Sequence, residues 1–302
     1  MQDDFVTKSG MRLSDVMLLE YCTYGSYPNP PNGYPQVWES SYGITDVNAA
    51  LSSLEERGYI RFKTAKEMLP MLTVPQLKAA AAAVGVSAKG KKADLIFALS
   101  NVPDSELEQA IPNRKYRLTE KGDAAHKANA HVIFAVQHTG INVSPERMEE
   151  LVAENPKIPF RDLIWGELNS RVDKYMYSRA WGFCRNNCLS MFYLVYGEHR
   201  YDVAFSQLVE IFYYDVNSKS PMIAPGIVEL MQNCAERLSL TEEETFERAK
   251  RLTVGTAAER DYVDGIDVAG IIALLVAKRY EFARAVLKQY PEVDQSFFEK
   301  LR

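Results

Sequence analysis

The chain has 302 residues, of which 47% are hydrophobic and 25% are charged, and this balance is typical of a globular protein with about two domains. Acidic residues outnumber basic residues by 40 to 35, so the average composition argues against a nucleic-acid binder, whose domains usually carry a basic excess. The sequence contains no run of 18 or more uncharged apolar residues, which excludes a predicted membrane span.

The N-terminal segment and the cysteines indicate in which cellular compartment the protein is expected. The first residues lack both the basic and the apolar region of a signal peptide, and four cysteines are too few for a disulfide scaffold. Cys184 and Cys188 lie four residues apart on a predicted helix, but no second Cys or His pair completes a tetrahedral metal site. We therefore expect a cytoplasmic protein with buried thiols and no metal.

The first elements follow in a characteristic order. Apolar residues on one face predict a helix over residues 13–21, and the prolines of residues 27–35 then exclude regular structure. A short helix is expected over residues 36–42, followed by a longer one from Thr45 or Asp46 to Arg57. Residues 59–62 alternate like a half-exposed strand. Helix, short helix, turn, helix and strand is the element order of a winged helix.

A winged helix needs a second strand beside the first, and the candidate lies far downstream at residues 115–122. Its Tyr-Arg-Leu-Thr-Glu-Lys-Gly sequence resembles the wing-closing strand that leads into the final helix of many winged-helix proteins. Residues 1–63 and 114–126 are therefore expected to form a winged helix. Residues 64–113 would be an insertion at the tip of the wing, because loop tips tolerate insertions.

The insertion contains two short helices joined by a lysine-rich loop. Thr73 and Gln76 form a capping box at the start of the first helix, which ends at Gly85, and the second helix covers residues 93–99. This helix, extended loop and helix, with its Leu-Lys, Gly-Val and Gly-Lys-Lys-Ala-Asp-Leu-Ile spacing, resembles the SAP domain, a small DNA-binding motif. The first helix departs from that family because it is an alanine run with few charges.

The resemblance implies a set of DNA contacts. SAP domains typically bind DNA, often A/T-rich, through helix N-termini and the lysines of the loop. Carried over to this sequence, the implied contacts are Thr73, Val74, Lys78, Lys89, Gly90, Lys91 and Lys92. Charge favours the same conclusion, because eight basic residues but only one acid, Glu67, lie between Arg57 and Lys92. The free N–H groups at a helix N-terminus also favour phosphate. The alternative is a solvated loop that binds nothing.

The helix that follows the turn of a DNA-binding winged helix enters the major groove. Here that helix covers residues 46–57, and Glu55 and Glu56 on its surface would repel the DNA backbone. The residues of this helix and of the adjoining strand that could contact DNA are Asn48, Ser52, Arg57, Arg61 and Lys63. Both groove binding and a purely structural or protein-docking role are therefore open interpretations.

Residues 127–302 are predicted to be entirely helical, with a long aromatic-rich helix over residues 160–185. Residues 189–214 and 268–290 share a pattern of helix, tight turn and helix, which is similar to tetratricopeptide-like repeats that form protein-binding surfaces. A plain helical bundle is the alternative. This part of the chain has 21 basic and 25 acidic residues, so we expect a protein partner or self-association here rather than broad DNA contact.

No glycine-rich phosphate loop, nucleophile elbow or metal-spaced histidine pair is present, so the sequence predicts a non-enzymatic protein without a cofactor. The predicted fold is mainly α: a winged helix with an inserted SAP-like module, followed by an all-α repeat or bundle domain. The predicted function is anchoring to double-stranded DNA, as in bacterial or phage accessory proteins of transcription or DNA metabolism. The alternative is a protein-docking adaptor whose helical part binds a partner or dimerises and whose N-terminal part is structural.

Overall fold

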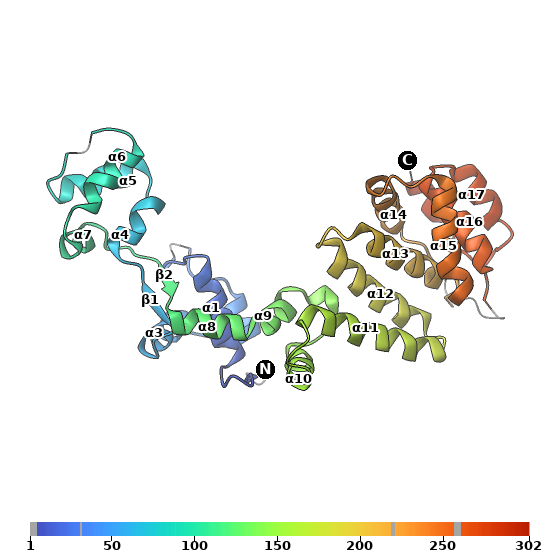
Figure 1. The fold of residues 1–302 in the computed structure, drawn as a ribbon, viewed down its shortest axis with the longest axis horizontal. Helices are drawn as coiled ribbons and strands as arrows, with labels where there is room; N and C mark the ends of the chain where they lie inside the picture. The colour runs from blue at the N-terminus through green and yellow to red at the C-terminus, as the bar shows by residue number, and fades with distance from the viewer. Residues whose placement is uncertain (1–4, 31, 88, 219–220, 257–260, 302) are drawn as a thin grey trace. The chain divides into compact units, whose positions relative to one another are not determined.

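A computed structural model describes residues 5–30, 32–87, 89–218, 221–256 and 261–301. These residues form a mainly α-helical protein with one two-stranded sheet (Figure 1). The chain divides into two compact units, Met1–Val136 and Gln137–Arg302. The division falls after Val136 rather than after residue 126, because Ile133 and Val136 of helix α9 (Ala130–Gln137) pack against the core of the N-terminal unit.

Outside residues 64–113, the N-terminal unit is built from helices around a two-stranded antiparallel sheet. Its further elements are α1 (Leu13–Thr23), α2 (Val37–Tyr42), α3 (Val47–Glu56), β1 (Ile60–Phe62), β2 (Tyr116–Leu118) and α8 (Glu120–Ala128). Asp46 caps α3 by accepting a hydrogen bond from the Ala49 N–H at 2.9 Å, and Leu51 and Leu54 of this helix are fully buried. β1 pairs with β2 so that Ile60 lies opposite Leu118. The two strands are far apart in sequence but adjacent in the fold.

Helix α8 packs very closely on the chain that enters β1. Thr119 caps this helix and also donates its backbone N–H to the carbonyl oxygen of Tyr59 at 3.0 Å. Gly122 lies so near that a Cβ atom at this position would be 1.9 Å from the same oxygen. A glycine is therefore required in the first turn of α8, because any larger residue would push the helix away from the sheet.

Residues 64–113, here called the inserted module, leave the chain after β1 and return before β2 (Figure 1). The module consists of α4 (Ala65–Met68), the 3-10 turn η1 (Leu69–Met71), α5 (Val74–Ala83), α6 (Lys92–Ser100) and α7 (Asp104–Ala110). Its apolar residues form a core of their own, with Leu77, Leu95, Leu99 and Leu107 completely buried. Sequence analysis located α5 and α6 but not the short helices α4 and α7.

The C-terminal unit contains helices that pack mainly against their neighbours in the sequence. They are η2 (Thr139–Ile141), α10 (Pro145–Glu154), α11 (Phe160–Tyr177), α12 (Trp181–Tyr196), α13 (Tyr201–Val216), α14 (Pro225–Arg237), α15 (Glu242–Thr256), α16 (Gly265–Val276), α17 (Tyr280–Leu287) and η3 (Ser296–Lys300). None of the helices in the described ranges is both long and apolar enough to cross a lipid bilayer.

One type of turn joins several of these helices. A residue other than glycine adopts a positive φ after the helix, and the next N–H bonds back to a carbonyl five residues earlier, as in a Schellman motif. The residues with positive φ are Arg179, His199, Ser239 and Lys278, and the bonds run from Ala180 to Tyr175, Arg200 to Val195, Leu240 to Ala235 and Arg279 to Leu274. The expected continuous helix over residues 160–185 is therefore wrong, because the first of these turns ends α11 and starts α12.

Candidate nucleic-acid interface

The two main helices of the inserted module begin close to one another. Thr73 and Gln76 form the expected capping box at the start of α5, where Gln76 Oε1 accepts the Thr73 N–H at 2.9 Å. At the start of α6, Lys92 Nζ donates to the carbonyl oxygen of Pro70 at 2.9 Å. Pro70 precedes α5 by only a few residues, so the N-terminus of α6 lies beside the turn that leads into α5. Backbone N–H groups without partners inside the helix are thus present at two neighbouring helix starts.

The loop before α6 depends on glycine. Gly90 has a φ of +107°, and a Cβ atom there would lie 2.6 Å from Asp94 Oδ2. The same Asp94 oxygen accepts the backbone N–H of Lys91 at 2.8 Å and so fixes the entry into α6. Sequence analysis missed this acid, which occupies one N–H group and places a negative charge beside the helix start.

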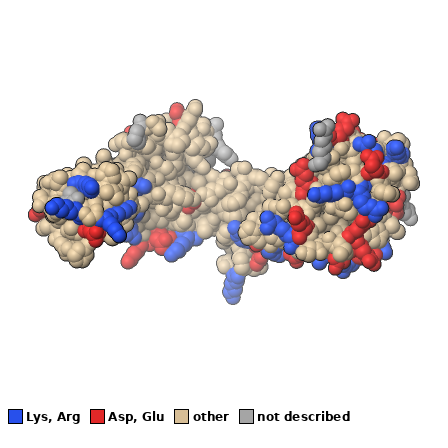
Figure 2. Space-filling view, turned by 90° about the horizontal axis from the view of Figure 1, so that it is seen from above, with Lys and Arg blue, Asp and Glu red and all other residues tan. Residues whose placement is uncertain are grey.

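Three lysines of the module are exposed and form no ion pair within the described residues. Lys78, Lys89 and Lys91 are exposed, and no contact within the described residues engages their ammonium groups. Val74, the first residue of α5, is 37% exposed. Figure 2 shows Lys and Arg side chains gathered on the part of the N-terminal unit that carries the module. The ammonium of Lys92, in contrast, is held by the Pro70 carbonyl.

Two more basic residues between Arg57 and Lys92 pair with acids. Arg57 forms two hydrogen bonds of 2.9 Å to Asp15, which raise its pKa, and Lys66 pairs with Asp104 at 3.2 Å. Both acids lie outside this stretch of sequence. The local excess of positive charge in the sequence is therefore smaller in the folded protein.

Glu67 of α4 offsets two arginines at once. It accepts hydrogen bonds from Arg61 of β1 at 2.8 and 2.9 Å, and it also pairs with Arg117 of β2. The hydrogen bonds from Arg61, followed by those from the Thr64 N–H and Arg117, lower the pKa of Glu67 to about 2. Arg61 thus joins the sheet to the inserted module instead of facing solvent as an unpaired cation.

The candidate contacts on α3 are separated from the loop of the module. The Asn48 Oδ1 accepts from the Tyr34 hydroxyl at 2.6 Å, and its amide group donates to Asn29 Oδ1. Asn48 therefore ties α3 to the proline-rich segment, whereas Ser52 is exposed. Lys63, after β1, contacts the sulfur of Met71 at 3.2 Å. The structure does not bring Asn48 or Ser52 together with the lysines of the module.

The described residues offer no other obvious centre for chemistry. They contain no cluster of three or more His, Cys, Asp or Glu side chains suited to a metal ion. All four cysteines are free and buried, which confirms the expectation of buried thiols for Cys184 and Cys188. Burial raises the pKa of Cys184 to about 11 and that of Cys22 to about 12, so these thiols are poor nucleophiles.

No protein-family model, curated protein or solved structure matches this chain.

Proposed function

We propose that this protein is a non-enzymatic DNA-binding protein that holds the phosphate backbone of double-stranded DNA with its inserted module. The observation that supports this proposal best is the exposure of three lysines without ion pairs, Lys78, Lys89 and Lys91, on a module in which the start of α6 bonds to the turn before α5. The module resembles a SAP domain, and the surrounding helices with β1 and β2 resemble a winged helix that carries it.

The physical basis is the attraction of phosphate to these groups. The positive end of the helix dipole favours an anion at the start of α5 and α6, although in α5 Pro75 has no N–H and the Gln76 N–H is already bonded to Thr73 Oγ1. Each lysine that neutralises a phosphate releases bound counterions, so the affinity depends steeply on salt. Arg57 and Arg61 are already paired with acids, and the winged helix therefore serves mainly as a scaffold in this proposal.

The test is a salt titration of DNA binding by the full chain, measured as fluorescence anisotropy with a labelled duplex. The variant Lys78→Ala/Lys89→Ala/Lys91→Ala should bind far more weakly, and its plot of log affinity against log salt should be shallower by about 2.7, because each lost phosphate contact contributes about 0.9. The control is Lys8→Ala/Lys121→Ala/Lys127→Ala, which removes the same charge from exposed positions of the N-terminal unit outside the inserted module.

The control variant should keep most of the affinity and nearly the wild-type salt slope. Equal losses in the two variants would show that only net charge matters, and that the module is not the binding site. Unchanged binding by the first variant would refute the proposal directly.

A second function is favoured by aromatic side chains around the turn between α11 and α12. Tyr177 is 98% exposed and Phe183 is 59% exposed, and the Phe183 ring stacks on Tyr175 at 4.9 Å. We infer that the C-terminal unit uses this surface to self-associate or to bind a protein partner. Light scattering of the full chain over a concentration series tests self-association. A concentration-dependent mass that Tyr177→Ser/Phe183→Ser abolishes would support self-association through this surface, and a constant monomer mass would exclude self-association.

A further inference from the structure

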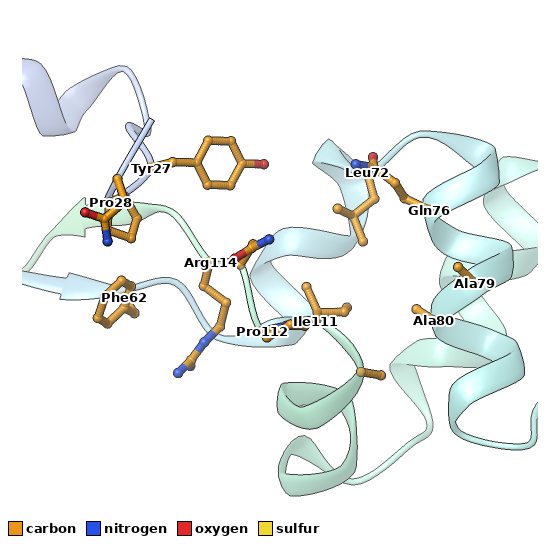
Figure 3. A pocket seen from close by; sticks show the side chains of 13 residues that line it. Tyr27, Pro28, Phe62, Leu72, Gln76, Ala79, Ala80, Ile111, Pro112 and Arg114 are labelled. Carbon is orange, nitrogen blue, oxygen red and sulfur yellow. The ribbon is translucent and has the colours of Figure 1, made fainter. Parts of the chain in front are cut away.

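A cleft of about 630 Å³ lies between the inserted module and the rest of the N-terminal unit. In Figure 3 the ring of Tyr27 projects from the proline-rich segment across this space towards Leu72 and Gln76 of the module. Phe62 and Arg114 line the side formed by the strands, and Ala79 and Ala80 line the side formed by α5. The cleft thus joins an aromatic wall, an apolar wall and a set of polar groups.

The two aromatic rings of the cleft differ in what they can still bind. The Phe62 ring stacks on the Tyr116 ring at 4.3 Å between centroids, and the Arg114 guanidinium lies 5.5 Å from the centroid of the Phe62 ring. Phe62 therefore forms a fixed wall of the cleft. Tyr27 is 37% exposed, and the Lys115 ammonium lies 4.7 Å from its ring centroid. Tyr27 therefore offers a partly exposed ring with a cation close to it.

Three side-chain amides also line the cleft: Asn29, Gln76 and Asn113. The Oε1 atom of Gln76 is occupied by Thr73, and the Oδ1 atom of Asn29 accepts from Asn48. The amide NH₂ groups of Gln76 and Asn29 can then act as hydrogen-bond donors. Amide side chains are suited to the edges of nucleobases, which present acceptors and donors side by side.

The charge near the cleft is predominantly positive. Lys63 and Lys115 both flank Gly25, two residues before Tyr27, since a Cβ atom at Gly25 would lie 3.7 Å from Lys63 Nζ and 3.4 Å from Lys115 Cδ. Arg114 also lines the cleft and pairs with Glu108 at 2.7 Å. Gln76, which caps α5, is part of the same wall, so a phosphate at the start of α5 would border the cleft.

We propose that this cleft binds an unpaired nucleobase, so that the protein prefers DNA with a gap or a bulge to a continuous duplex. This inference rests on the proposed function, because the inserted module holds the phosphates while Tyr27 stacks on the base. Every base has a π face, which makes such stacking tolerant of sequence. A base that is already unpaired enters at the lowest cost, whereas a paired base must first leave the stack. An apolar peptide would not use the cations and amides of the cleft.

The experiment compares two DNA duplexes of the same sequence, one continuous and one that lacks a single nucleotide in one strand. In both, 2-aminopurine occupies the position of the other strand that lies opposite this nucleotide, so it is unpaired only in the gapped DNA. The full wild-type chain should bind the gapped DNA at least about fivefold more tightly, which is the lower bound for one stacked base. Binding should also change the 2-aminopurine fluorescence of the gapped DNA only. Tyr27→Ala should abolish both effects and leave the affinity for continuous duplex within about twofold, since stacking on one ring is lost while the phosphate contacts are kept.

Two variants make the result specific to the ring of Tyr27. Tyr27→Phe keeps the ring and should keep the preference for gapped DNA. Tyr24→Ala removes a nearby tyrosine that is 72% exposed and does not line the cleft, and it should also keep the preference. These two outcomes, together with the loss in Tyr27→Ala, support the proposal.

Two failures can be told apart. If the wild type binds gapped and continuous DNA equally, or if Tyr27→Ala keeps the preference, the cleft does not hold a base and this inference is overturned while DNA binding stands. If the wild type binds neither DNA at any salt concentration, the proposed function itself fails and the inference fails with it.

Discussion

The close contact between α8 and the chain before β1 predicts the effect of Gly122→Ala on the N-terminal unit. The added Cβ atom would lie 1.9 Å from the Tyr59 carbonyl oxygen, whereas real Cβ contacts are almost never shorter than 3.0 Å. The first turn of α8 must therefore move by at least about 1 Å relative to β1, and overpacking of this kind costs about 1–3 kcal/mol. That movement also strains the Thr119 hydrogen bond to Tyr59, worth about 1 kcal/mol.

A gain partly offsets this cost, because alanine is favoured over glycine inside a helix by about 1 kcal/mol. We therefore expect Gly122→Ala to lower the free energy of unfolding by about 1–3 kcal/mol. Gly166 in α11 is the control, since no atom lies within 4 Å of the Cβ position there and only the helix preference changes. Gly166→Ala should leave stability unchanged or raise it by up to about 1 kcal/mol.

Urea unfolding followed by tryptophan fluorescence measures the change in the free energy of unfolding of the N-terminal unit. Trp38 is 6% exposed in the core of the N-terminal unit, and the chain has three tryptophans. In a Trp165→Phe/Trp181→Phe background, the fluorescence therefore reports on the N-terminal unit alone, and circular dichroism follows the Gly166 control. A midpoint for Gly122→Ala equal to or above that of its parent would refute the close packing of α8 on β1.

Two further predictions concern the loop of the module and a buried acid. Gly90→Ala should weaken both DNA binding and the stability of the module, because the new Cβ atom would lie 2.6 Å from the Asp94 carboxylate and the φ of this residue is +107°. Fluorescence anisotropy measures the loss of DNA binding, and hydrogen exchange of residues 89–100 measures the loss of stability. Burial raises the pKa of Asp215 to about 6 in the folded state, so the native protein binds more protons than the unfolded chain between about pH 4 and pH 6. The contribution of Asp215 to stability should fall as the pH rises through this window, and Asp215→Asn should remove this contribution when unfolding of both proteins is measured near pH 4 and near pH 7. A pH-independent difference between wild type and this variant would contradict the prediction.

Much of the local structure could be predicted from the sequence because its signals are local. The N-cap Asp46 and the capping box of Thr73 lie at the starts of α3 and α5. The mainly helical fold was predicted correctly. The turn at Arg179 was missed because neither glycine nor proline marks it, although Arg179 has a positive φ and the Ala180 N–H closes the turn on the Tyr175 carbonyl. Apolar periodicity alone does not show a helix end at which an ordinary residue takes the positive φ that usually favours glycine.

The candidate site was predicted less completely, because charge along the chain differs from charge in space. Lys78, Lys89 and Lys91 are exposed as expected. Arg57 was counted as a candidate cation, but its partner Asp15 comes from α1. The cleft beside Tyr27 was also missed, since residues 27–29, Gln76 and residues 110–114 converge only in the fold. A proline-rich segment containing aromatic residues was its only sequence signal.

The ion pairs between the sheet and the inserted module also hold the two walls of the cleft together. Glu67 belongs to the inserted module, whereas Arg61 and Arg117 belong to the two strands on which the module is carried. The backbone bond from Lys63 to Lys115 closes the base of the insertion at 2.8 Å. These contacts limit rotation of the module relative to Phe62 on the strand side. Arg61, which sequence analysis named as a candidate DNA contact, thus also helps to hold the module on the sheet.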